Sequence, residues 1–290
     1  MKKAIIILIA ISILPYVALA QGLYGTSYPT NGSTYYGFES ADGSSSSYSS
    51  YFGYRAGKSS IGNYNIGIGR SAGADADGNY NVYVGYFSGE GTSGSGNTFL
   101  GADTGEYSNG DNNVYIGDSS GFVTTGSNNI FIGYYLGGFQ TVSNTLYIDS
   151  NNTPNPLIYG KFDTDQVGIN TNYVPSDYTF AVNGKMITEE VLVQLRTVWP
   201  DYVFENNYNL PTLTEVEFHI KENGHLQNIP SATEVEEHGI LLGDMNAKLL
   251  QKIEELTLYT IQQQKELELQ KDKNLSLEDR LNKLEQLVLK

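Results

Sequence analysis

The sequence predicts a mainly β protein with an α-helical C-terminus, whose largest part is a stack of short repeated turns. Two observations lead to this fold class. Residues 34–145 divide into seven copies of a 16-residue unit without insertion or deletion, and a heptad pattern of apolar residues runs through the C-terminal end. A fixed period over so long a stretch indicates a stack of identical turns rather than a globular core.

Each unit contains a short apolar run that a glycine closes. Runs such as Val114-Tyr115-Ile116 alternate in the manner of a strand. We expect the aliphatic first and third positions to face inward and the aromatic second position to face outward. The closing glycines permit positive φ at the corners of the coil. They are Gly37, Gly53, Gly69, Gly85, Gly101, Gly117 and Gly133.

Small and amide side chains occupy other fixed places in the unit. Four residues after each closing glycine stands a second small residue, Gly57 in the second copy and Ala41 in the first. Asparagine ends most units, and stacked asparagines are expected to form hydrogen-bonded ladders between turns. A further small position is expected to point inward, as Ala56, Ala72, Ser88, Thr104 and Ser120.

The aromatic residues at the second strand position form a column. It comprises Tyr35, Tyr51, Tyr83, Phe99, Tyr115, Phe131 and Tyr147, and Gly67 interrupts it. An outward column of this kind would be an exposed apolar stripe on a monomer. The sequence therefore predicts that the column is buried between chains, with trimer contacts at Tyr83, Phe99, Tyr115 and Phe131.

The run 112–121, Asn-Asn-Val-Tyr-Ile-Gly-Asp-Ser-Ser-Gly, resembles the head repeats of trimeric autotransporter adhesins. The resemblance implies a left-handed parallel β-roll, three chains side by side and a surface that binds host or matrix molecules. Two features depart from that family. The second strand position is aromatic rather than small, and the family's C-terminal membrane anchor has no counterpart, so autotransport is not implied.

The chain on either side of residues 34–148 has a distinct character. Residues 1–20 are predicted to be a signal peptide, because Lys2 and Lys3 precede an apolar run that ends at Ala18-Leu19-Ala20. Residues 21–33 are a polar lead-in.

Residues 149–190 are predicted to form a β neck, with short strands expected at 157–160, 167–170 and 178–184. They resemble the shaft segments of secreted tail-fibre-domain proteins.

Residues 191–246 are predicted to be a small α/β module. Strands are expected at 192–195 and 202–204, on either side of Trp199-Pro200-Asp201. Two capping boxes, Thr212 with Glu215 and Ser231 with Glu234, predict helices that end at Gly224 and Gly239.

The segment 225–246 resembles the end of tail-fibre-domain proteins, which are distantly similar to the endosialidase-type intramolecular chaperone domain. That domain's Ser-Asp-x-Arg type motif is not found near the start of the module, so self-cleavage is not implied.

Residues 247–290 are predicted to form a trimeric coiled coil, because six consecutive heptads hold one register. Polar layers in the middle, at Gln263, Gln270 and Asn274, cost stability and fix the register and strand number. Together with the adhesin-like repeats, the expected number of chains is three. The predicted contacts at the a and d positions are Leu249, Ile253, Leu256, Leu267, Leu277, Leu281, Leu284 and Val288.

Composition and charge limit the partners. The net charge is −15, and removal of the signal peptide takes away two lysines and gives −17. An acidic chain without a basic patch is not expected to bind nucleic acid. After residue 20 no apolar run is long enough to span a membrane. There is no Cys, and the histidines at 219, 225 and 238 are spread along the sequence, so neither a metal nor a cofactor is expected.

These features favour an exported homotrimeric fibre of the adhesin type, secreted or held at the cell surface, whose ligand is a surface glycan or a matrix protein. The alternative is a glycan-cleaving or self-cleaving spike. Acidic residues do lie near one another in the array, but a thin roll has little room for the cleft around two carboxylates that a glycosidase needs. Calcium-binding repeats would need a Gly-Gly-x-Gly-x-Asp pattern, which is absent.

Overall fold

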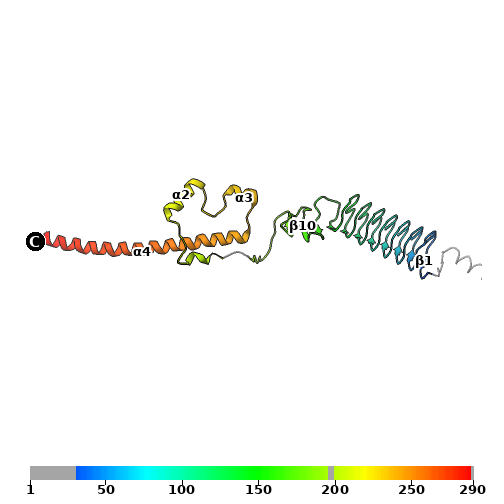
Figure 1. Ribbon diagram of the computed structural model, residues 1–290, viewed down its shortest axis with the longest axis horizontal. Helices are drawn as coiled ribbons and strands as arrows, with labels where there is room; N and C mark the ends of the chain where they lie inside the picture. The colour runs from blue at the N-terminus through cyan, green and yellow to red at the C-terminus, as the bar shows by residue number, and fades with distance from the viewer. Residues whose placement is uncertain (1–30, 195–198, 289–290) are drawn as a thin grey trace, which may run out of the picture. The chain divides into compact units, whose positions relative to one another are not determined.

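The structure is a computed structural model that describes residues 31–194 and 199–288. The chain divides into two compact units, Met1–Ile187 and Thr188–Lys290. The predicted signal peptide, most of the lead-in 21–33, and Leu195 lie outside the described residues. Figure 1 shows the solenoid as the row of blue to green turns and α4 as the long helix near the C-terminus.

The first unit is a β-solenoid, which confirms the stacked coil. Its eight parallel strands pair in sequence order, and each residue lies beside the one 16 positions further on, as Tyr115 does beside Phe131. The strands are β1 Thr34–Tyr36, β2 Ser50–Phe52, β3 Ile66–Ile68, β4 Val82–Val84, β5 Thr98–Leu100, β6 Val114–Ile116, β7 Ile130–Ile132 and β8 Thr145–Ile148. A second row of single-residue parallel bridges, from Ile61 to Thr141, joins another part of each turn.

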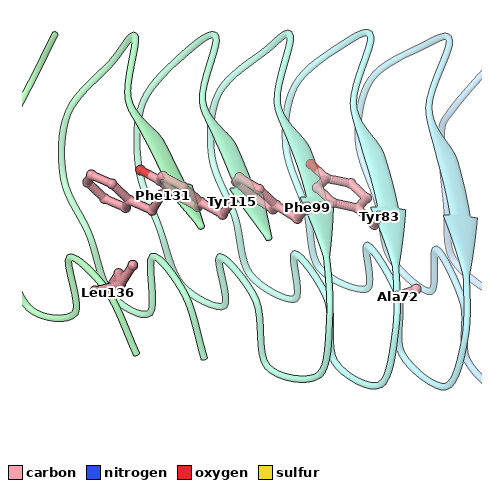
Figure 2. Packing of buried hydrophobic residues seen from close by; sticks show 7 residues of the cluster. Ala72, Tyr83, Phe99, Tyr115, Phe131 and Leu136 are labelled. Atoms are coloured by element: carbon pink, nitrogen blue, oxygen red, sulfur yellow. The ribbon is translucent and has the colours of Figure 1, made fainter. Parts of the chain in front are cut away.

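The facing of the strands is the reverse of the prediction. Tyr51, Tyr83, Phe99, Tyr115 and Phe131 are all 0% exposed and fill the interior of the coil, as Figure 2 shows for the last four. Rings of neighbouring turns stack, with centroids 4.9 Å apart for Phe99 and Tyr115. The predicted trimer contacts at Tyr83, Phe99, Tyr115 and Phe131 are therefore wrong, because each ring is covered by its own chain.

The second small residue of each unit explains why the rings fit inside. Gly121 has φ +70°, and a Cβ there would lie 2.1 Å from Cδ2 of Tyr115. The ring of each turn thus lies directly over this glycine, and any side chain at the glycine would occupy the space of the ring. The same relation holds for Gly57 with Tyr51, Gly89 with Tyr83, Gly105 with Phe99 and Gly137 with Phe131.

The other interior positions follow the prediction. Ala56, Ala72, Ser88, Thr104 and Ser120 are all 0% exposed. The asparagine ladder is also confirmed. Each backbone N–H donates to the side-chain oxygen of the asparagine one turn earlier, as from Asn97 to Asn81 at 2.8 Å and from Asn113 to Asn97 at 2.9 Å. These bonds satisfy buried polar groups that would otherwise be costly.

The closing glycines turn the chain at a place with no room for a side chain. Gly85 has φ +142°, and a Cβ there would lie 2.1 Å from the carbonyl oxygen of Gly101 in the next turn. The predicted turn role of these glycines therefore has two causes, a backbone angle that L-residues rarely adopt and close contact between turns.

The interruption at Gly67 divides the buried column into two clusters. Tyr35 and Tyr51 lie on one side, and the rings from Tyr83 to Phe131 on the other. Gly67 leaves its space to Tyr51, because a Cβ at 67 would lie 2.6 Å from Cδ1 of that ring.

Three further strands follow the parallel array and confirm the β pieces of the neck. They are β9 Ile158–Lys161, β10 Gln166–Ile169 and β11 Phe180–Val182. β9 pairs antiparallel with both β8 and β10, so the direction of the chain reverses at Asp149. An Asp149 carboxylate oxygen accepts a bond of 2.7 Å from the N–H of Leu157, and this bond holds the pKa of Asp149 below its ordinary value.

The second unit is helical in its described residues. Strands expected at 192–195 and 202–204 are wrong: 192–194 carry no regular structure, and η1 Pro200–Phe204 is a 3-10 helix. Both predicted capping boxes are confirmed, at the starts of α2 Leu213–Asn223 and α3 Ala232–His238. The α/β description of residues 191–246 is therefore replaced by short helices.

α4 Leu242–Val288 is one continuous helix. The segment before α2 packs against the first half of α4. The Tyr202 hydroxyl donates to Oε1 of Gln251 at 3.0 Å, the Tyr208 hydroxyl bonds the Glu255 carboxylate, and Val203 is only 2% exposed.

Tyr83→Phe is expected to stabilise the solenoid by about 1 kcal/mol at pH 7, because the buried Tyr83 hydroxyl has no hydrogen-bond partner among the described residues. Burial, followed by Tyr51 and Asp77, raises the pKa of Tyr83 far above 10. The folded protein therefore keeps Tyr83 neutral, while the same tyrosine ionises in the unfolded chain above about pH 10. The stability that comes from this difference in pKa is complete below about pH 10 and is lost as pH rises above it.

Tyr83→Phe should accordingly gain further over the wild type between pH 10 and pH 11. Urea unfolding at pH 7 and at pH 11, followed by hydrogen exchange of peptides from 34–148, measures both effects. A loss of stability at pH 7 would mean that the hydroxyl has a partner after all.

Candidate functional site

The exposed surface of the solenoid consists of columns of side chains, since every outward position recurs one turn later. Three of these columns stand out by chemistry: the outer face of the strands, a tyrosine stack, and a corner where aromatic and charged side chains mix. Each is built from residues 16 positions apart along the chain.

The outer face of the strands is uncharged and mainly apolar. We call its outward residues, the first and third of β1–β7 together with Leu146 and Ile148 of β8, the outer strip. Ile66, Ile68 and Leu100 are 42%, 45% and 47% exposed, while Phe99, the ring beside Leu100, is 0% exposed and points inward. These aliphatic side chains were expected inside, and aliphatic side chains such as the β-branched Ile66 and Ile68 suit either face of a strand.

Tyr48, Tyr64 and Tyr80 form an exposed stack beside the asparagine ladder. Their ring centroids are 5.2 and 5.0 Å apart and the rings are nearly parallel. Stacking within the column covers the ring faces, so this column presents ring edges and hydroxyl groups to its surroundings.

At the mixed corner the guanidinium group of Arg70 lies among aromatic rings of neighbouring turns. The guanidinium carbon of Arg70 lies 5.5 Å from the ring centroid of Tyr54, 5.4 Å from Tyr86 and 5.6 Å from Phe87. Tyr54, Arg70 and Tyr86 share one column, so the arginine fills a place where an aromatic ring could stand and makes cation–π contacts instead.

Carboxylates gather further along the same corner. Burial, and then the charges of Glu106 and Asp75, raise the pKa of Glu90 to about 7. Burial also raises the pKa of Asp103 and Glu106. Glu39 differs, because a hydrogen bond from Lys58 lowers its pKa. The corner therefore becomes more negative as pH rises through neutrality, where Glu90 ionises.

The helical unit contains an apolar groove between α2 and α4. It has a volume of about 430 Å³ and is lined mainly by Leu213, Val216, Leu226, Leu249, Ile253 and Leu256. The last three are predicted coiled-coil contacts, so this part of the seam lies beside α2 of the same chain.

The remaining predicted seam residues lie along α4 beyond that groove. We call the a and d apolar residues of α4 the helix seam. Leu267, Leu277, Leu281 and Leu284 are all exposed, between 49% and 60%, and Val288 is 85% exposed. The structure thus places the seam on one helix, and within the described helical unit its part beyond the groove is left exposed.

The three histidines lie on or next to the short helices α2 and α3. His219 and His238 lie on α2 and α3 as expected, and the rings of His219 and His225 meet edge to face with centroids 5.7 Å apart. Across the described ranges, no group of three or more His, Cys, Asp or Glu side chains is placed to hold a metal ion. No helix of residues 31–194 or 199–288 combines the length and apolarity needed to cross a membrane.

Comparison with known proteins gives no match to a family model, to a curated protein or to a solved structure. What the arrangement can do therefore follows from the chain alone. Its surfaces are columns of recurring side chains. The surface feature that sequence reasoning missed is the outer strip. The small residue four positions after each closing glycine, Gly in six copies and Ala41 in the first, leaves room for a ring inside only once the turn is closed.

Proposed function

We propose that the chain is the subunit of an exported homotrimeric fibre of the adhesin type. Its solenoid, seven repeats wound as a left-handed roll, forms a head that presents ligand-binding columns, and α4 assembles three chains as a coiled coil. The ligand is a surface glycan or a matrix protein. Repeated columns in three copies give many weak contacts, which act together through avidity.

The observation that carries this proposal is the uncovered helix seam. Among the described residues of the helical unit, this helix of 47 residues with exposed leucines at heptad spacing is covered only in its first half, where it contacts η1 and lines the groove. Helical stability in proteins comes mainly from packing of an apolar face. Further copies of the same helix supply a matching seam, and the polar layers at Gln263, Gln270 and Asn274 restrict how the copies align.

Leu277→Glu with Leu281→Glu is expected to convert the trimer to monomers, because six carboxylates would meet in two adjacent layers of the coiled coil. Light scattering on the full chain measures the mass. The matched control is Leu269→Glu with Leu275→Glu, which changes two leucines of the same helix, 69% and 55% exposed, that lie off the seam.

The control should keep the trimeric mass. An unchanged oligomer in the seam variant, or a monomeric wild type, would overturn the coiled-coil assembly. Binding of glycans and matrix proteins is then compared between the trimer and the monomeric variant, with an expected affinity loss of about 10²-fold or more for a multivalent head.

A further inference from the structure

The outer strip is an uncharged surface on a strongly acidic chain. Two side chains from each of the eight strands form it, and none of them is charged, although the net charge is −15. Those from β6 and β7, at positions 114, 116, 130 and 132, are all Val or Ile. A sheet face that meets water is normally polar, whereas on this face only Thr34, Ser50 and Thr98 are small polar residues.

The spacing of the strip indicates which surface can pack against it. Its side chains form rows one strand apart, about 4.8 Å, over eight strands in unbroken register. Only a surface with the same spacing can pack against every row without drifting out of register, and a second copy of this solenoid has that spacing. A copy also brings its own uncharged strip, whereas the carboxylates of the mixed corner would lose their hydration if an apolar strip covered them.

We propose that the outer strip is the contact between heads, with three strips facing a common axis parallel to the stack. This inference rests on the proposed homotrimer and names the surface through which its heads meet. It replaces the aromatic column, which is buried within each chain, as the interface. The mixed corner and the tyrosine stack then stay free to meet a ligand.

The size of the strip explains why the helix seam is needed as well. Eight strands at about 4.8 Å give a strip roughly 34 Å long and, with two side chains, about 10 Å wide. Its area of about 340 Å² is less than half of the roughly 800 Å² per partner that stable association uses. The heads alone should therefore associate weakly, and the coiled coil raises their effective concentration to the millimolar range.

Cross-linking in the full-length protein tests the proposal, since the chain has no cysteine and each introduced thiol is unique. Leu100→Cys and Ile116→Cys place a thiol on the strip, and Ile61→Cys is the matched control. Ile61 is an aliphatic residue, 56% exposed, in the second row of bridges rather than in the strip. Facing sheets lie about 10 Å apart, so a bismaleimide of that reach is used rather than a disulfide.

The expected result is conversion of most chains to covalent dimers with a thiol at 100 or 116, and a mainly monomeric band on a denaturing gel with a thiol at 61. Three outcomes in a protein that light scattering shows to be trimeric would overturn the strip as the interface and leave the trimer intact. They are equal cross-linking at all three sites, cross-linking at 61 alone, and no cross-linking at any site. A monomeric mass would overturn both.

Discussion

Phe99→Ala is expected to lower the free energy of unfolding of the solenoid by about 3–5 kcal/mol, because it removes a whole ring from the middle of the buried column. The ring is 0% exposed and lies between those of Tyr83 and Tyr115 at 5.7 and 4.9 Å. Its removal leaves a cavity that neighbouring turns, tied to one another by hydrogen bonds at every row, have little freedom to close.

The measurement is urea unfolding of the full chain, followed by hydrogen exchange of peptides from residues 34–148. Tyr107→Ala is the control, because Tyr107 belongs to the same solenoid but is 55% exposed, and its loss should cost less than about 1 kcal/mol. A Phe99→Ala head that kept its stability and only dissociated would show that the ring faces another chain.

Gly121→Ala is expected to destabilise the solenoid by about 2–5 kcal/mol. Two costs add: the left-handed backbone, about 1–2 kcal/mol for an L-residue, and overpacking against the buried ring, about 1–3 kcal/mol. The added methyl would lie 2.1 Å from Cδ2 of Tyr115, a contact that neither the ring nor the backbone can relieve without displacing neighbouring turns.

Gly43→Ala separates these two costs. Its φ of +71° matches the +70° of Gly121, but a Cβ there would lie 3.6 Å from the nearest atom, an ordinary contact. Gly43→Ala should therefore show only the backbone cost in the same unfolding experiment. Equal losses in the two variants would mean that the ring does not press on Gly121.

The sequence determined the stack and its register, because a period of 16 residues without insertions leaves only one way to align successive turns. It also placed the corners, since the closing glycines stand where no side chain fits. Both helix starts at Thr212 and Ser231 could be predicted, because a capping box depends only on residues three positions apart.

Which face of each strand points inward could not be predicted in the same way. Alternation along Val114-Tyr115-Ile116 fits two arrangements, aliphatic side chains inside or the ring inside, and both satisfy the period of two. The choice depends on the opposite wall of the turn, where Gly121 leaves a space of the size of a ring. That space exists only once the turn is closed.

The segment 202–204 shows the same limit in the second unit. Tyr202, Val203 and Phe204 favour a strand locally, but Val203 is buried where η1 packs against α4, and Tyr202 bonds Gln251, 49 residues away. Local pattern thus determined the repeat, its turns and its helix caps, while the tertiary structure decided which side chains are covered, because burial depends on contacts between residues far apart in the chain.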